Sequence, residues 1–254
     1  MEGWQAMNAV YVLWIRQLKR YVRSRSRIIG ALGQPLMFLI ALGYGFGAIF
    51  RRAGAGNYIT FLVPGVIAQT ILFAAVFNGS EIIWDRQFGF LKETLVAPVS
   101  RFNIMLGRTL GGATVAVIQG LIVLALSHIV GFRILNYLML PVAVVFMFVI
   151  ALMFTALGTA IASRLTDFQG FQLIMNFLVM PMFFLSGALF PLSGLPRGLA
   201  IATRIDPLSY GVDAMRGTLT NSAHLGLHND ILVLAISTVV LLFLGSYLFS
   251  KIEV

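Results

Sequence analysis

The chain has 254 residues, of which 59% are hydrophobic and only 11% charged, and its mean hydropathy is +0.93. Soluble domains are typically about 45–50% apolar and about 25% charged, so a water-soluble globule of this size could not cover the apolar surface. The composition excludes a cytosolic enzyme, a secreted domain and a disordered chain, and it leaves a polytopic membrane protein. The net charge of +9 then indicates cytoplasmic loops and anionic headgroups rather than nucleic acid. Without cysteine, a disulfide framework and a thiolate metal site are excluded.

The N-terminal arm, residues 1–27, has the pattern of an interfacial amphipathic helix. One face carries apolar and aromatic residues at spacings of three and four, namely Trp4, Met7, Tyr11, Trp14, Leu18 and Tyr21. Another face carries Arg16, Arg20, Arg23 and Arg27, which can reach lipid phosphates. We predict a helix along the inner leaflet that turns into the first span near Gly30. A basic flank that only fixes topology, or a docking face for a partner, are the other interpretations.

Six apolar runs follow, each long enough to cross a bilayer as a helix. The predicted spans are residues 28–50, 58–79, 104–130, 138–162, 171–192 and 231–250. The runs are continuous, which excludes the alternating ten-residue strands of a membrane barrel. The fold class is therefore all-α and integral to the membrane. Pro181 lies within the fifth span, where we expect a kink or a re-entrant helix pair.

The distribution of basic residues predicts the orientation. With the N-terminus inside, twelve Lys and Arg residues lie on the cytoplasmic side and six on the outside. This bias favours a multi-pass protein of the plasma (inner) membrane with both termini in the cytoplasm.

The cytoplasmic segment 80–103 is too amphipathic for a span and too apolar for an idle linker. Its apolar residues Trp84, Phe88, Leu91 and Leu95 recur at helical spacing. Gly89 can divide the helix in two, and Pro98 can end the second piece. The residues alone fit two interpretations, a helix that enters the groove of a soluble partner and a helix that lies on lipid.

Four stretches of the chain carry distinctive motifs. The loop carries Trp84-Asp85-Arg86, Gly89, Leu91, Glu93, Leu95-Val96-Ala97-Pro98 and Ser100-Arg101. The others are Phe61-Leu-Val-Pro-Gly65, Leu185-Ser-Gly-Ala-Leu-Phe-Pro191 and Asp206-Pro-Leu-Ser-Tyr-Gly-Val-Asp-Ala-Met-Arg216. Together these stretches resemble the ABC-2 type permeases, the membrane subunits of a class of ABC exporters, and they occur in the family's order across nearly the whole chain. Lys92 departs from the family, in which an acidic or neutral residue is common there.

The resemblance implies a six-span subunit of the type V exporter-like architecture, residues 28–254, which pairs with a second permease copy above two ATPase subunits. A homodimer is the simplest form, although a second, different permease could serve. The loop would be the coupling helix that fits into a cleft of the ATPase. Its residues would be Trp84, Asp85, Arg86, Phe88, Gly89, Leu91, Glu93, Leu95 and Pro98.

The sequence contains no motif that would let the chain drive transport by itself. The dipeptide Gly-Lys does not occur, so a Walker-type phosphate loop is excluded, and ATP and Mg²⁺ would be bound by the partner ATPase. The predicted spans contain only two ionisable residues, Arg108 near the inner end and His128 near the outer end of span three. Ion-coupled carriers usually need such groups at mid-depth. We expect Arg108 to snorkel to the interface or to face the inner vestibule, and we expect neither a metal site nor an active site.

Two further regions are candidate parts of the transport path. Span five is rich in Met and Phe, which suit a surface that accepts varied apolar ligands, and its candidate path residues are Phe177, Met180, Phe183 and Phe184. Lipid-facing filler is the alternative. The outer segment 193–230 is expected to form a gate with a short helix that partly dips into the membrane. The candidate residues of the outer gate are Pro191, Asp206, Pro207, Asp213 and Arg216, with Asp206 as the helix cap and Asp213 paired with Arg216.

The function that fits these features is the permease subunit of an ATP-driven exporter for a hydrophobic or amphipathic, drug-like or lipid-like cargo. The Asp-Pro-Leu-Ser-Tyr run is closest to the branch that exports drugs and lipooligosaccharides. Export of lipid-linked polysaccharide is the alternative within the family. A stand-alone channel or ion-coupled carrier is the alternative from another class.

Overall fold

The computed structural model describes residues 2–52, 56–192 and 194–252, and among these it is helical and contains no strand. The side chains of residues 2–6 and 27, and so the predicted roles of Trp4 and Arg27, lie outside the description.

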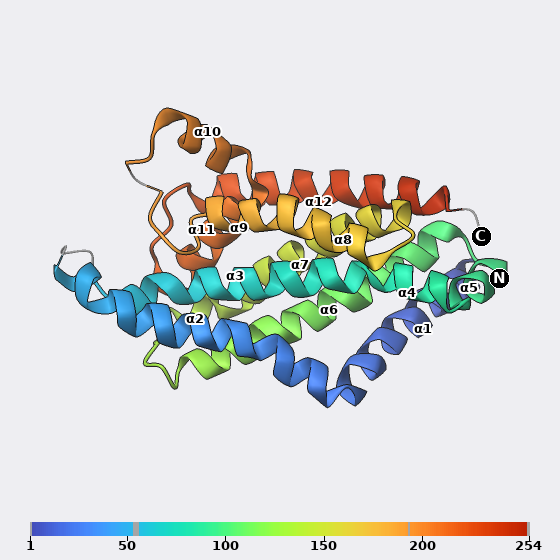
Figure 1. Ribbon diagram of the computed structural model, residues 1–254, viewed down its shortest axis with the longest axis horizontal. Helices are drawn as coiled ribbons and strands as arrows, with labels where there is room; N and C mark the ends of the chain where they lie inside the picture. Colours follow the sequence, from blue (N-terminus) through green and yellow to red (C-terminus); the bar gives the residue numbers. More distant parts are fainter. Residues whose placement is uncertain (1, 53–55, 193, 253–254) are drawn as a thin grey trace.

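The molecule is an elongated bundle with both termini at one end, here called the terminal end, beside α4 and α5 (Figure 1). Helices α10 and α11 lie towards the opposite, distal end. The elements are α1 (Glu2–Arg23), α2 (Arg25–Arg52), α3 (Tyr58–Gly79), α4 (Glu81–Gln87), α5 (Phe90–Val96), α6 (Arg101–Ser127), the 3₁₀ turn η1 (Tyr137–Met139), α7 (Leu140–Arg164), α8 (Phe168–Ile174), the π-helix η2 (Met175–Val179), α9 (Met180–Leu185), α10 (Arg197–Ile205), α11 (Pro207–Thr220) and α12 (Leu227–Ser250).

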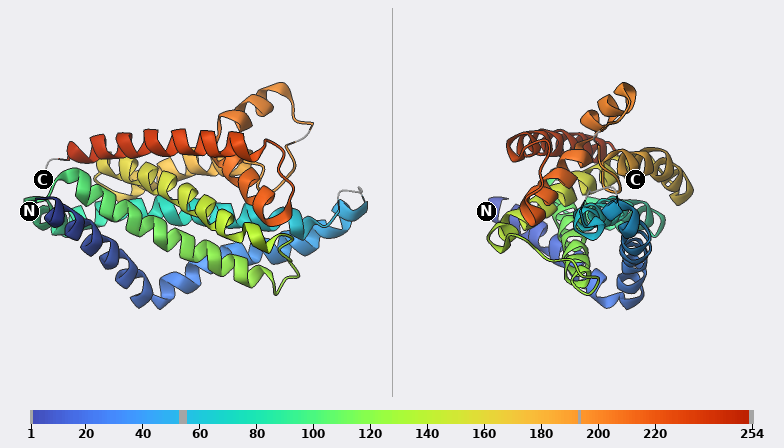
Figure 2. Two further views of the ribbon diagram at one scale, coloured as in Figure 1. Left: turned by 180° about the vertical axis from the view of Figure 1, so that it is seen from behind. Right: turned by 90° about the vertical axis from the view of Figure 1, so that its left-hand side faces the viewer.

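Six helical segments are long and apolar enough to cross a membrane, as predicted. Helix α3 coincides with the predicted second span and lies at the centre, packed against α2, α6, α7 and α11. Its crossing with α7 is very close, because Gly79 and Gly158 meet backbone to backbone and a Cβ on either would overlap the other helix. Small residues at helix crossings allow this approach in a membrane protein. By contrast, α2 and α12 are mostly exposed along their lengths (Figure 2).

The helix α1 is joined to α2 by a sharp bend at Ser24, six residues before the predicted turn near Gly30 (Figure 1). The predicted position of the turn is therefore wrong. Helix α1 packs along α6. A Cβ added to Gly107 would come within 2.8 Å of the Val10 carbonyl oxygen, and one added to Gly111 within 2.7 Å of Gln17. The two glycines of α6 thus allow α1 to pack closely, so one side of α1 is covered by protein.

The fifth span differs from its predicted bounds. It begins at Phe168 and ends at Leu185, seven residues before the predicted end. Where we expected a kink or a re-entrant helix pair at Pro181, the structure has a π-helical turn, η2, just before this proline, in which the Met180 amide donates to the carbonyl of Met175, five residues back. Proline has no amide hydrogen to donate, and π-turns of this kind commonly occur where an α-helical ladder is interrupted.

Two predicted spans contain more charge than expected. Helix α3 continues through Ser80 into α4, so the apolar segment Tyr58–Gln87 includes Glu81, Asp85 and Arg86. Helix α12 begins at Leu227, four residues early, and includes the fully buried Asp230 in its first turn. The expectation that Arg108 and His128 are the only ionisable residues within the spans is therefore wrong.

Candidate coupling and transport sites

The coupling segment forms two short helices at the terminal end. Helix α4 ends at Gln87, and α5 begins after Gly89, whose φ of +78° lies in the left-handed region that favours glycine. Helix α5 ends at Val96, two residues before Pro98. The break at Gly89 and the stop before Pro98 are confirmed as predicted.

The apolar residues of this segment do not share one environment. Trp84 and Phe88 are exposed, Phe88 to 68%, and their rings stack with centroids 6.1 Å apart. Leu91 is fully buried and belongs to the hydrophobic core of the chain, because α5 folds back beside α4. Leu91, which the helical spacing grouped with Trp84 and Phe88, therefore does not share their exposed surface. The half-exposed Phe90, which the helical spacing did not single out, lies on the open side of α5 instead.

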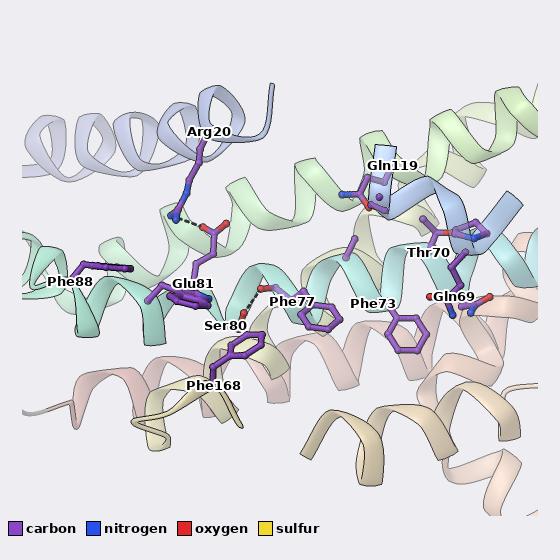
Figure 3. Close-up of a pocket in the computed structure, with 16 residues that line it drawn as sticks. Arg20, Gln69, Thr70, Phe73, Phe77, Ser80, Glu81, Phe88, Gln119 and Phe168 are labelled. Carbon is purple, nitrogen blue, oxygen red and sulfur yellow. Dashed lines mark hydrogen bonds and ion pairs between the residues drawn. The ribbon is translucent and has the colours of Figure 1, made fainter. Parts of the chain in front are cut away.

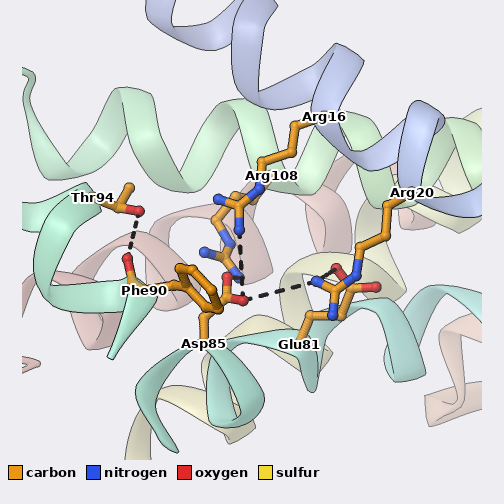
Figure 4. A network of polar contacts seen from close by, with 7 residues as sticks. All are labelled: Arg16, Arg20, Glu81, Asp85, Phe90, Thr94 and Arg108. Atoms are coloured by element: carbon orange, nitrogen blue, oxygen red, sulfur yellow. Dashed lines mark hydrogen bonds and ion pairs between the residues drawn. The ribbon is translucent and has the colours of Figure 1, made fainter. Parts of the chain in front are cut away.

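A network of charges joins the coupling segment to α1 and α6 (Figure 4). Asp85 of α4 is buried, and its Oδ2 lies 2.7 Å from Nη2 of Arg108 on α6. From α1, Nη2 of Arg16 and Nη1 of Arg20 each lie 3.8 Å from Oδ1 of Asp85, and Arg20 also lies 3.4 Å from Oε2 of Glu81. Arg108 therefore neither snorkels nor faces an open vestibule. A buried carboxylate needs such partners because desolvation of an unpaired charge is costly.

Helix α4 is also held by backbone groups at the end of α7. The Arg86 guanidinium donates to the carbonyl oxygens of Leu165 and Ser163 at 2.8 and 3.2 Å, and the Gln87 amide donates to Thr166 at 3.3 Å. These carbonyls end α7, where they have no partner within the helix. The motif residues Asp85 and Arg86 thus fix α4 to α6 and α7, while Glu93 is exposed and Leu95 partly buried.

The four candidate path residues of span five do not share one face. Phe177 and Phe184 are exposed, Phe177 to 82%, and Met180 is partly buried. Phe183 is only 1% exposed, with its ring near Phe73 and Phe38 at centroid distances of 6.1 and 6.4 Å. The structure therefore assigns Phe183 to the core, so the path expectation applies to the other three residues.

At the distal end, α11 is buried against α3, α7 and α12. Its start is confirmed as predicted, with Pro207 in the first turn and the Asp206 carboxylate accepting from the Leu208 amide at 2.9 Å. Burial raises the pKa of Asp206 to about 7, although this hydrogen bond acts in the opposite direction.

The predicted pairing of Asp213 with Arg216 is not formed; each uses other partners. The Asp213 carboxylate accepts from the amides of His224 and Leu225 at 2.7–3.0 Å. Arg216 donates to the Gly187 carbonyl at 2.7 Å and stacks over Phe61 at 3.8 Å. Burial lowers the pKa of Arg216 to about 10, and nearby Asp213 opposes this shift. These groups line a cavity of about 250 Å³ that the exposed Pro191 also borders.

Among the described residues, no group of three or more His, Asp or Glu side chains could hold a metal ion. His128 lies at the exposed end of α6, with Nδ1 3.0 Å from the Leu124 carbonyl oxygen.

The comparisons with known proteins agree with this architecture. The family model of the ABC-2 type transporters matches residues 8–220. Nodulation protein J of Rhizobium leguminosarum bv. trifolii is 27% identical over 95% of this chain and 90% of its own length. The putative transport permease ycf38 of Cyanophora paradoxa is 28% identical over 86% and 77%. A probable doxorubicin resistance ABC transporter permease, DrrC of Mycobacterium tuberculosis, is 26% identical over 80% and 73%. The chain belongs to the ABC-2 type transporter family and is a membrane permease subunit, which implies a partner ATPase.

Proposed function

We propose that this permease exports a hydrophobic or amphipathic, drug-like or lipid-like molecule, and that a separate ATPase subunit drives it through the α4–α5 segment. Two ATPase subunits, which bind the ATP and Mg²⁺, would serve a dimer of permeases, most simply a homodimer. Both termini, α4 and α5 share the terminal end (Figure 1). The excess of basic residues there supports its placement in the cytoplasm.

The observation that carries this proposal is the two-sided character of α4. One side is fixed to the bundle by the Asp85–Arg108 pair and by Arg86 on the end of α7. The other side presents the stacked rings of Trp84 and Phe88. Helix α4 is fixed to α6 and α7 on one side and presents apolar rings on the other. It can therefore transmit a movement of the partner, because a force on the rings of Trp84 and Phe88 also moves α6 and α7.

The nature of the cargo is supported by the exposed side chains of the fifth span. Phe177 and Phe184 present apolar surface from η2 and α9, and π-helical turns such as η2 are frequent at functional sites. The similarity to a relative named for doxorubicin resistance supports a cargo of drug-like character.

The test is co-purification of the permease with its ATPase in mild detergent, together with the ATPase rate in liposomes. Leu91 is unsuitable as the probe because its substitution would disturb the core. We expect Phe88→Ala to weaken association roughly thirtyfold, because interface anchors commonly contribute about 2 kcal/mol or more. Glu93→Pro should break α5 and uncouple hydrolysis from cargo.

The matched control is Leu135→Ala, which truncates an equally exposed apolar side chain in the loop after α6, away from the terminal end. This variant should retain the ATPase. Wild-type association and transport by both Phe88→Ala and Glu93→Pro would contradict the coupling role and would leave α4 and α5 as helices that lie on lipid.

A further inference from the structure

A cavity of about 590 Å³ lies within the single chain, between α2, α3 and α6 (Figure 3). It is separate from the exposed residues of the fifth span and from the cavity at the distal end. Sites for small molecules commonly measure about 300–1,000 Å³. The space is therefore large enough for a ligand, and one subunit supplies all of the walls described here.

One wall is a single stripe along the continuous helix α3–α4. The side chains of Gln69, Phe73, Phe77, Glu81 and Trp84 follow one another at steps of three and four residues, which place them on one face. Twelve residues separate Gln69 from Glu81, or about 18 Å at the helical rise. Since Gln69 lies halfway along α3 and Trp84 lies at the terminal end, the cavity runs from the middle of the bundle to that end.

The deep end of the cavity is polar. Gln69 is only 2% exposed, and its Oε1 accepts no hydrogen bond from any residue that the structure describes. Gln119 of α6 borders the same space and is also buried. The Thr70 hydroxyl is not available to donate a hydrogen bond to Gln69, because it donates to the Val66 carbonyl at 2.8 Å. Buried amide oxygens are nearly always paired, so the Gln69 oxygen is suited to a donor on a ligand.

The middle and the mouth have a different chemistry. Phe73 and Phe77 present aromatic rings to the space, and Trp84 lies beside Phe168 of α8 with ring centroids 5.4 Å apart. At the mouth, the Arg20–Glu81 pair leaves little net charge. An acyl chain could fill the aromatic part but has no donor for Gln69.

We propose that this cavity binds a flat aromatic amphiphile that carries an N–H or O–H donor, and that it is the place where the cargo first lodges. The donor pairs with Gln69, and the aromatic body lies along Phe73 and Phe77. The role in transport rests on the proposed function, whereas the binding does not. Trp84 and Phe88 border the mouth of the cavity and also face the proposed ATPase site, so a molecule that enters from the terminal end passes the same rings that the partner contacts.

The fold offers a matched pair of blocking variants on α2. Gly30 borders the cavity, whereas Gly33, one turn further on, does not. A Cβ at either position would meet nothing within 4 Å, so Gly30→Phe and Gly33→Phe should both fold. Only the first places a ring in the cavity.

The probes are the fluorescent dyes proflavine, which has two amino groups, and 10-methyl acridine orange, in which these groups are dimethylated and the ring nitrogen is methylated, so that no N–H donor remains. Binding to the purified permease in lipid nanodiscs, without the ATPase, is measured by fluorescence anisotropy against empty nanodiscs. We expect saturable binding of proflavine by the wild type and by Gly33→Phe, and a loss of at least tenfold in Gly30→Phe. Gln69→Leu should weaken proflavine roughly tenfold and leave 10-methyl acridine orange unchanged.

Absence of saturable proflavine binding by the wild type would overturn the proposal. So would equal binding by the two glycine variants, or equal effects of Gln69→Leu on the two dyes. Transport of proflavine by Gly30→Phe at the wild-type rate would overturn the role as entry site. Failure of the ATPase to associate would overturn the coupling proposal alone, because no ATPase is present in the binding measurement.

Discussion

The two ends of the bundle stabilise buried charge in opposite ways. At the terminal end, Asp85 is surrounded by guanidinium groups from two other helices, and the arginines of α1 remain nearly half exposed. At the distal end, Asp213 and Arg216 bind amide and carbonyl groups of neighbouring loops and helices. Side chains on long stems can exchange partners, whereas backbone dipoles are fixed by the chain.

This difference suggests a division of labour. The terminal end, where we propose that the ATPase acts, has charge pairs at 3.4–3.8 Å that a small helix movement can lengthen or shorten. The distal end has short hydrogen bonds that close α11 onto the ends of the spans. The comparison predicts that equivalent truncations cost more at the distal end than at the terminal end.

The largest effect is expected for Arg216→Ala. It removes hydrogen bonds to buried carbonyls and the contact with Phe61, and it leaves the Gly187 carbonyl without this donor. We expect a loss of about 3–5 kcal/mol, measured as thermal unfolding of the purified permease in mild detergent. Arg197→Ala, at the exposed start of α10, is the control and should change stability little. Equal losses of thermal stability in the two variants would contradict a special role of Arg216 in stability.

A smaller effect is expected for Arg108→Met at the terminal end. Asp85 then loses its 2.7 Å partner, but Arg16 and Arg20 remain 3.8 Å away, so we expect a loss of about 2–3 kcal/mol. Asp85→Asn in the same chain should recover part of it, because the unpaired charge is gone. Arg20→Ala should cost less than about 1 kcal/mol, since this arginine is nearly half exposed. A loss for Arg20→Ala as large as that for Arg108→Met would contradict the ranking.

An effect smaller than that of Arg108→Met is a pH dependence that arises at the distal end. The pKa of Asp206 is about 7 in the fold, against a usual 3.8, because burial favours the protonated form. The folded state therefore binds the proton more tightly, and stability falls as pH rises from about 4 through 7. Between pH 6 and 8 the fall is about 1.4 kcal/mol. Asp206→Asn keeps an acceptor for the Leu208 amide and should flatten the unfolding profile over this range. If stability fell with pH as steeply in Asp206→Asn as in the wild type, a group other than Asp206 would be the one that titrates.

Much of the architecture could be predicted because it depends on local pattern. Continuous apolar runs of about twenty residues predicted six spans, and Asp206-Pro207 predicted the start of α11. The break at Gly89 and the stop before Pro98 were also predictable, because the backbone chemistry of glycine and proline acts within a few residues.

The site was less predictable because its geometry depends on distant partners. The pattern of the loop grouped Leu91 with Trp84 and Phe88, but α5 folds back and buries Leu91 in the core. The three-residue spacing of Asp213 and Arg216 predicted a pair, but nearby backbone groups compete for both side chains. The stripe from Gln69 to Trp84 has helical spacing in the sequence, yet it becomes visible only when α3 and α4 are known to be continuous.

The sequence by itself determined that this protein is a six-span, all-helical membrane permease of the ABC-2 family, because hydrophobic length, proline and glycine positions and motif order are properties of the chain alone. The tertiary structure decided which charged and aromatic side chains meet. Asp85 forms ion pairs with Arg108 on α6 and with two arginines on α1. Phe183 is buried in the core, and Gln69 lies at the deep end of a cavity. These outcomes depend on how the helices cross, and the crossings are set by small residues such as Gly79 and Gly158, whose effect depends on the helix that packs against them.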